Sequence, residues 1–188
     1  MIDKALTLLN GQLNGFLNGR FSVNGSERAA LGPVPDLSND TPPSHPLTLS
    51  LVRVEEERVM KTQVATRMRD GQVEDVQPDV KLNLFLLVTA HGISYADALK
   101  FLSATVAFFQ SRPFFDHANA PGLDEGIEKL LVELYSQSFE EQNQLWGSLS
   151  LRYLPSVLYR VRMLIIQDGT PLRTTPGIRS VDLSEAKV

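Results

Sequence analysis

The spacing of apolar residues predicts alternating helices and strands along the first half of the chain. Apolar residues recur at helical intervals over residues 2–17, which predicts an amphipathic helix. Residues 47–55 alternate between apolar and polar positions as a strand does. Residues 81–90 form a nearly continuous apolar run, which predicts a strand covered on both faces. A helix with a broad apolar face follows over residues 94–111, and Ser94 is its expected cap.

The second half of the chain repeats this alternation. Residues 127–135 form a third apolar run that predicts a strand. Ser138 and Glu141 have the spacing of a capping box, which predicts a short helix that ends near Trp146. An apolar strand is predicted over residues 156–166, after the proline at the end of the preceding loop.

The connections between these elements differ in length and composition. Residues 18–46 are rich in glycine, proline, serine, asparagine and aspartate, which predicts a long loop. Asp70-Gly71 is a turn signal and predicts a hairpin. Residues 114–126 are expected to form a loop with an aromatic anchor, and residues 168–188 an extended C-terminal tail.

Taken in chain order, these elements predict an α+β fold. We expect a mixed, mainly antiparallel sheet with the helices gathered mainly on one face. A chain of 188 residues is long enough for one domain with a proper core, which we assign to residues 1–167.

The first helix contains two glycines, Gly11 and Gly15, within a repeated Leu-Asn-Gly pattern. An interior glycine costs a helix about 1 kcal/mol relative to alanine, so the pair needs a reason. One explanation is the close approach of another helix or backbone along the glycine face. The other is early fraying of the helix into the loop that follows.

Arg160 and Arg162 lie in the middle of the last apolar strand. Charged side chains are rarely buried without partners, so we expect an edge, a cleft or a subunit boundary where they face acids or water. Arginine is favoured at interfaces because its planar fork pairs with carboxylates. The alternative is a partly buried ion pair within the monomer.

Composition narrows the functional classes. The net charge of −4 and the lack of a basic run argue against binding to nucleic acid. The chain has no cysteine, and its three histidines are scattered without the spacing of metal ligands. Phosphate-binding loops and nucleophile elbows are not found, so we predict no catalytic residues, cofactor or metal.

The N-terminus lacks the pattern of a signal peptide, and the longest apolar run is too short to span a bilayer. We therefore expect synthesis in the cytoplasm without a membrane span. The features that remain are typical of protein contacts.

Three short motifs carry a resemblance to a known family. They are Leu-Trp at 145–146, Arg-Tyr-Leu-Pro-Ser at 152–156 and Tyr-Arg-Val-Arg at 159–162. In this order they resemble the C-terminal signature of the cap, or tail-terminator, proteins of extracellular contractile injection systems, which are phage-tail-like particles. Residues 2–17, 82–90 and 95–110 resemble the family's opening helix, central strand and following helix.

The resemblance implies a structural protein and not an enzyme. It implies a six-fold ring, a homo-hexamer, at the end of the tail distal to the baseplate, which closes the inner tube and caps the last ring of contractile sheath. The partners would be the sheath protein, the inner tube protein and, in some particles, a second cap protein. The particle would stay in the cytoplasm or be released. The candidate contact residues are Gly11, Gly15, Trp146, Arg152, Tyr153, Arg160 and Arg162.

Two other functions stay open at this point. One is a tail-completion protein of a contractile-tailed phage, with a similar architecture and a head-joining partner. The other is a small α+β ligand-binding or hydrolytic domain whose site is built from distant residues.

Overall fold

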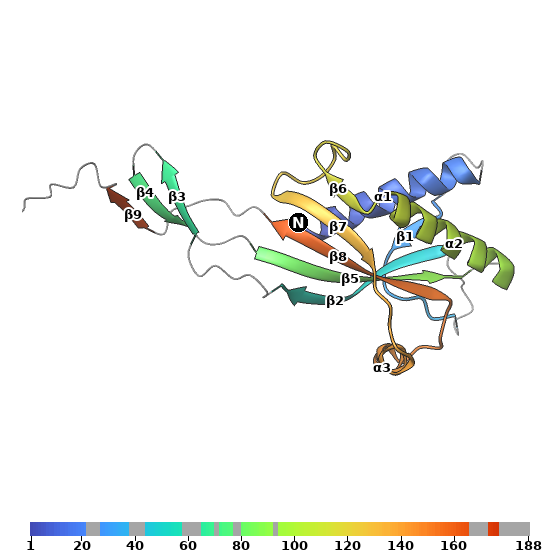
Figure 1. Ribbon diagram of the computed structural model, residues 1–188. Coiled ribbons are helices and arrows are strands. Elements are labelled where there is room, and N and C mark those ends of the chain that lie inside the picture. The colour runs from blue at the N-terminus through green and yellow to red at the C-terminus, as the bar shows by residue number, and fades with distance from the viewer. Residues whose placement is uncertain are drawn as a thin grey trace, which may run out of the picture.

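The computed structural model describes residues 1–21, 27–37, 44–57, 65–69, 72–76, 80–91, 94–165 and 173–176. Its main body is a curved six-stranded sheet with helices on both faces, and a small three-stranded sheet lies beyond one end of it (Figure 1). The helices are α1 (Ile2–Arg20), α2 (Tyr95–Ser111) and α3 (Phe139–Leu149).

The main sheet has the strand order β1-β2-β5-β8-β7-β6. Its strands are β1 (Ala29–Leu31), β2 (Leu47–Glu56), β5 (Val80–Ala90), β8 (Ser156–Ile165), β7 (Ile127–Leu134) and β6 (Phe114–Asp116). Only the pair of β1 and β2 is parallel among these strands, so the prediction of a mixed, mainly antiparallel sheet is confirmed.

The small sheet is formed by β3 (Ala65–Arg69), β4 (Gln72–Val76) and β9 (Arg173–Pro176), all antiparallel. The predicted hairpin is confirmed, because Arg69 pairs with Gln72 across the turn. Asp70 and Gly71 themselves lie outside the described residues. The region assigned to the C-terminal tail contributes β9, a strand that the sequence analysis did not predict.

Helices α1 and α2 cover one face of the main sheet and form the larger core with it. The helical spacing of Leu9, Leu13 and Leu17 places all three on the buried side of α1, where none is exposed to solvent. Phe108 of α2 packs against Phe16 of α1, with ring centroids 5.3 Å apart. These two helices lie on the same face, as predicted.

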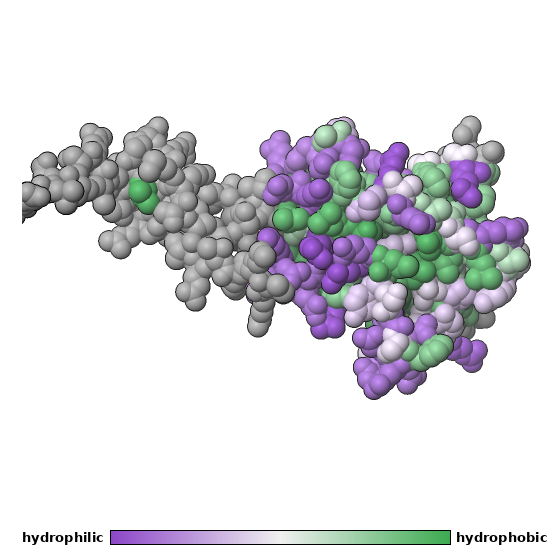
Figure 2. All heavy atoms as spheres, in the orientation of Figure 1, coloured by the Kyte–Doolittle hydropathy of each residue, from purple (hydrophilic) through white to green (hydrophobic). Residues whose placement is uncertain are grey.

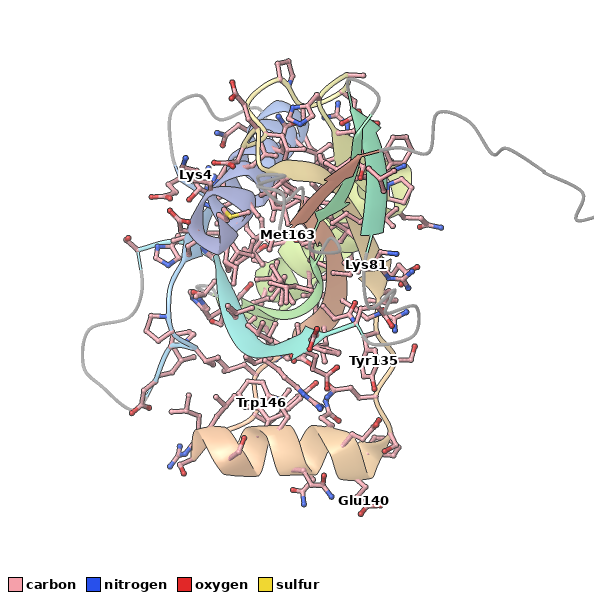
Figure 3. All side chains as sticks on the ribbon, turned by 90° about the vertical axis from the view of Figure 1, so that its left-hand side faces the viewer. Lys4, Lys81, Tyr135, Glu140, Trp146 and Met163 are labelled. Carbon is pink, nitrogen blue, oxygen red and sulfur yellow. The ribbon has the colours of Figure 1, made fainter. Side chains whose placement is uncertain are left out.

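Helix α3 covers part of the opposite face, which we call the α3 face. Trp146 points from α3 toward the sheet, whereas Glu140 points away from it (Figure 3). The tryptophan forms a small buried cluster with three residues of the sheet, Phe85, Leu87 and Leu158. The α3 face therefore has a much thinner apolar layer than the face under α1 and α2.

Both predicted helix caps are present. The Ser94 hydroxyl accepts a hydrogen bond from the Asp97 N–H at 3.1 Å. The Ser138 hydroxyl accepts from the Glu141 N–H at 3.2 Å, and Glu141 Oε2 accepts from the Ser138 N–H at 2.8 Å. This second pair is a complete capping box, and α3 continues to Leu149, three residues beyond the predicted end.

Other expectations are wrong in detail. Helix α1 continues through Gly11 and Gly15 to Arg20, so the helix does not fray early. The predicted long connection contains β1, and the predicted loop over residues 114–126 contains β6. Strands of three residues are too short to show periodicity, and their assignment depends on a neighbouring strand.

Candidate interaction surfaces

The two arginines of β8 lie on the α3 face, in the interior of the sheet. Alternation along β8 buries Tyr159, Val161 and Met163 in the larger core and directs Arg160 and Arg162 to the other side. Strand β8 lies between β5 and β7, so of the three expected positions, an edge, a cleft or a subunit boundary, the edge is wrong.

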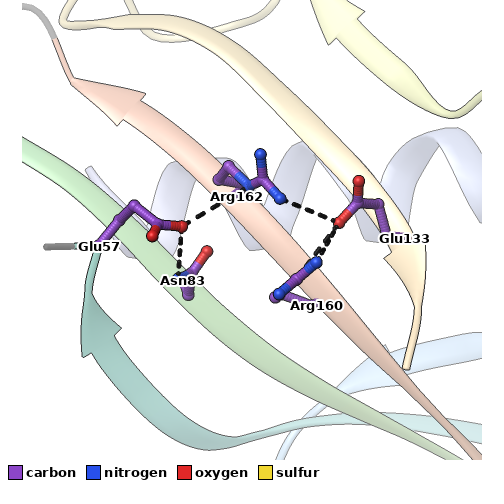
Figure 4. A network of polar contacts seen from close by, with 5 residues as sticks. All are labelled: Glu57, Asn83, Glu133, Arg160 and Arg162. Atoms are coloured by element: carbon purple, nitrogen blue, oxygen red, sulfur yellow. Dashed lines mark hydrogen bonds and ion pairs between the residues drawn. The ribbon is translucent and has the colours of Figure 1, made fainter. Parts of the chain in front are cut away.

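Glu133 of β7 accepts hydrogen bonds from both arginines. It lies opposite Arg160 in the register, and its Oε2 accepts from the Arg160 Nη2 at 2.7 Å. The Arg162 Nη2 donates to the same oxygen at 3.3 Å. One carboxylate is therefore shared by two guanidinium groups (Figure 4).

A second carboxylate completes this cluster from the other side. Glu57 Oε2 lies 3.9 Å from the Arg162 Nε and accepts a hydrogen bond from Asn83 Nδ2 at 3.1 Å. We call Glu57, Asn83, Glu133, Arg160 and Arg162 the arginine cluster (Figure 4). Its two positive and two negative charges balance. The ion pairs within the monomer that one of the two explanations predicted are therefore present.

The arginine cluster is partly open to solvent. The side chains of Arg160 and Arg162 are 35% and 33% exposed, and that of Glu133 is 46% exposed. Figure 2 shows the corresponding hydrophilic cluster over the middle of the sheet, bordered by apolar atoms. Exposed ion pairs contribute about 0–1 kcal/mol each, so the cluster adds little to stability and offers a polar surface for contact.

The candidate contact residues Trp146, Arg152 and Tyr153 differ in their exposure to solvent. Trp146 is 6% exposed and anchors α3, whereas Tyr153 is 58% exposed in the following loop. Their ring centroids lie 5.4 Å apart. Arg152 is also exposed. Of these three residues, only Arg152 and Tyr153 have exposed side chains that a partner could contact.

The glycines of α1 lie on its outer side, away from the sheet. A Cβ atom at Gly11 or Gly15 would meet nothing within 4 Å. The expected close approach of another element is thus wrong for the described part of this chain. A hollow of about 430 Å³ runs beside Gly11. It is lined by Lys4, Thr7, Leu8, Gly11, Gln12 and Gly122.

The predicted contact residues therefore form separate surfaces and no single site. The glycine face lies on α1, on the far side of the sheet from the arginine cluster. Sequence reasoning missed Glu133, Glu57 and Asn83. Glu133 had a weak signal, because it occupies a polar position in the apolar strand β7, but its partner depends on the register.

A buried histidine lies at another end of the α3 face. The His91 Nε2 lies 2.8 Å from the Thr48 hydroxyl, and the His45 ring is 5.8 Å away. Burial, with electrostatic repulsion from His45, lowers the pKa of His91 to about 4. The imidazole is therefore neutral at pH 7, and the hydrogen bond to Thr48 gives it a structural role.

His91 does not line any of four hollows in the described part of the chain. One of about 540 Å³ between α1, β1, β2 and α3 has mainly apolar walls, and His91 is not among its lining residues. Within the described part of the chain, no group of three or more histidine, aspartate or glutamate side chains could hold a metal ion. This arrangement gives little support to a ligand-binding or hydrolytic domain.

The fold is that of terminator proteins of contractile injection systems. The sheath/tube terminator of the PVC extracellular contractile injection system, in its extended state, superposes with a TM-score of 0.66 at 14% identity. The cap of the anti-feeding prophage, a tube-terminating cap, superposes with a TM-score of 0.61 at 15% identity. These matches cover 100% and 98% of this chain.

The chain belongs to the Pvc16 N-terminal domain family, whose model matches residues 5–180. It spans 64% and 61% of the lengths of the two terminator chains. No match is found among curated proteins. In the described residues, no helix combines the length and the apolar character that crossing a membrane requires.

Proposed function

We propose that this chain is the cap domain that closes the inner tube and the sheath of a contractile injection particle and stops their elongation. The observation that carries the proposal is the family match over residues 5–180 together with a fold shared over nearly the whole chain with two terminators. The role is structural, and the particle is an extracellular one like that of the PVC terminator.

The proposed partners are other copies of this chain, the sheath protein and the inner tube protein. Copies would form a homo-hexameric ring, and a second cap protein would join in particles that have two. A ring needs two different surfaces on each copy that fit each other. The glycine face of α1 and the arginine cluster lie on different sides of the sheet, as such a pair of surfaces requires.

Gly11 and Gly15 are the strongest candidates for a ring contact. They lie on the exposed side of a continuous helix, with open space where a side chain would be. Each destabilises α1 by about 1 kcal/mol relative to alanine, without any compensating contact within the described chain. Absence of a side chain lets the backbone of a neighbouring copy approach closely.

The proposal is tested by electron microscopy of particles from cells that lack this chain. Sheathed tubes of uncontrolled length, restored to normal by the wild-type chain, are the expected result. Particles of normal length would contradict the proposal. Heads attached to normal tails in the wild type would favour the phage tail-completion protein instead.

Substitution of the two glycines separates folding from assembly. The double variant Gly11→Ala/Gly15→Ala should raise the free energy of unfolding by about 1–2 kcal/mol, because each new Cβ enters open space. The variant Gly11→Leu/Gly15→Leu should fold but fail to form rings and to limit tail length.

Gly147→Leu is a matched control for the leucine variant. Gly147 also lies in a helix, and a Cβ there would meet nothing within 4 Å. We expect rings and normal tails with this control. Normal rings with leucine at both Gly11 and Gly15 would remove the glycine face from the interface.

A further inference from the structure

The outer edge of β1 is covered by an asparagine of α1. Strand β1 bonds to β2 on its inner side, where the Arg28 carbonyl accepts from the Leu47 N–H at 3.1 Å. Both backbone groups of Ala29 bond instead to the side chain of Asn14. The Asn14 Oδ1 accepts from the Ala29 N–H at 2.9 Å, and the Asn14 Nδ2 donates to the Ala29 carbonyl at 2.7 Å.

The opposite edge of the sheet has the same arrangement. Strand β6 bonds inward to β7, since the Pro113 carbonyl accepts from the Val132 N–H at 2.8 Å. Asn119 lies in the turn after β6. Its Oδ1 accepts from the Asp116 N–H at 3.1 Å, and its Nδ2 donates to the Phe114 carbonyl at 3.3 Å.

In both places a side-chain amide replaces a neighbouring strand. An asparagine side chain carries one carbonyl acceptor and an NH₂ donor, which match the outward N–H and C=O of an edge strand. An uncovered edge offers these groups to a strand from another chain. The two asparagines come from unrelated elements, a helix and a turn, yet each binds one outward N–H and one outward C=O of its edge strand. The Asn14 Oδ1 accepts a further hydrogen bond, from the Arg28 N–H at 2.7 Å.

We infer that Asn14 and Asn119 close the two lateral edges of the main sheet against pairing with a strand from a second copy of this chain. Copies then associate through side-chain surfaces, and a continuous sheet through β1 or β6 does not form. The closure of the edges is independent of the proposed function. The consequence for how copies meet in a ring rests on the proposed function.

The test replaces each asparagine by leucine, which has a similar size and no hydrogen-bonding group. Asn14→Leu should open the edge of β1, and Asn119→Leu that of β6. In dilute purified protein, hydrogen exchange at the Ala29 and Asp116 amides should accelerate by about five- to tenfold, because each loses a hydrogen bond. Sedimentation velocity should then show concentration-dependent association beyond the wild-type state.

Two matched controls add the same side chain without touching these hydrogen bonds. Asn10→Leu lies one helical turn before Asn14, and the Asn10 Oδ1 has no hydrogen-bond partner among the described residues. Ala118→Leu lies in the same turn as Asn119, and Ala118 is exposed. Both should exchange and sediment as the wild type does.

Faster amide exchange without added association would overturn the inference, because the asparagines would then only hold their strands in place. If Asn14→Leu does not fold, Asn14→Asp replaces it, since aspartate keeps the acceptor and loses the donor to the Ala29 carbonyl. These measurements use the isolated protein, so their outcome does not depend on whether the chain caps a tail.

Discussion

The two faces of the main sheet are built very differently. The face under α1 and α2 carries a large apolar cluster with several packed aromatic rings. Among the described residues, the α3 face has a buried apolar cluster of four, Phe85, Leu87, Trp146 and Leu158. Buried polar side chains gather on it. They are Thr48, Ser50, Asn83, Thr89 and His91.

This difference indicates that the face under α1 and α2 supplies more of the stability of the fold than the α3 face does. Apolar burial contributes roughly 25 cal/mol per Å², so the larger cluster dominates stability. The α3 face combines a small anchor, a partly exposed arginine cluster and a buried histidine. Substitutions on the two faces should therefore differ in size and in kind.

The largest effect is expected in the core under α1 and α2. Phe108 is fully buried and packs against Phe16, Phe109 and Phe115. Phe108→Ala should lower the free energy of unfolding by about 3–5 kcal/mol, through lost burial and the cavity that remains. Urea unfolding followed by circular dichroism measures this loss. Phe139→Ala, at a position 92% exposed, should change it by less than about 0.5 kcal/mol.

On the α3 face, the corresponding substitution is Trp146→Ala. Its cluster is small, and its buried indole N–H has no partner in the part of the chain that the structure describes. We therefore expect a loss of about 2–3 kcal/mol, at or below the lower end for such residues. The loss should be local. Hydrogen exchange should accelerate throughout α3 and stay slow in α2 under native conditions. Trp146→Phe, which keeps a ring in place, should lose less than about 1.5 kcal/mol.

An equal loss of hydrogen-exchange protection in α2 would contradict the proposed difference between the two faces. It would mean that α3 and the larger core unfold as one cooperative unit. Hydrogen exchange distinguishes the two cases because it reports opening of each element separately.

The three helices could be predicted from the sequence because their signals are local. Ser94, Ser138 and the apolar spacing of α1 each act within a few residues of themselves. The arginine cluster could not be predicted, although the strand that holds Arg160 was. Alternation shows which side chains share a face, but only the register of β7 against β8 brings Glu133 to Arg160.

The edges of the sheet were missed for a related reason. Strand β1 consists of three residues, paired in parallel with β2, and its outer hydrogen bonds come from Asn14. In the sequence this asparagine belongs to a Leu-Asn-Gly repeat in which the glycines, and not the asparagines, are the unusual residues for a helix. A side chain that pairs with a backbone fifteen residues away leaves no periodic signal.

The buried histidine makes the α3 face sensitive to pH. The pKa of His91 is about 4 in the folded chain against 6.5 for an ordinary histidine, so between these values the unfolded chain binds more protons. The free energy of unfolding should therefore fall as the pH falls from 6.5 to about 4, by at most about 1.4 kcal/mol per pH unit. Urea unfolding at several pH values across this window measures the slope.

His91→Gln removes this titration and should flatten the dependence. The carboxyl groups with lowered pKa values, Asp3, Asp97 and Asp124, start from an ordinary value of 3.8 and act mainly below the same window. An unchanged slope in His91→Gln would show that another group controls stability there.

The smallest effect on stability is expected in the arginine cluster. Glu133→Gln removes the carboxylate that Arg160 and Arg162 share, and both side chains are about one-third exposed. Solvent screens such pairs, so the free energy of unfolding should fall by about 1 kcal/mol or less.

Glu133→Gln leaves a surplus of positive charge on the α3 face. If this face meets acidic groups of a partner, Glu133→Gln should preserve or strengthen assembly, whereas Arg160→Gln/Arg162→Gln should weaken it. Charge reversal of the arginines is a poorer test, because new carboxylates would face Glu133 and Glu57 and destabilise the monomer itself. Assembly that tolerates loss of both arginines would leave the cluster with a role inside the sheet alone.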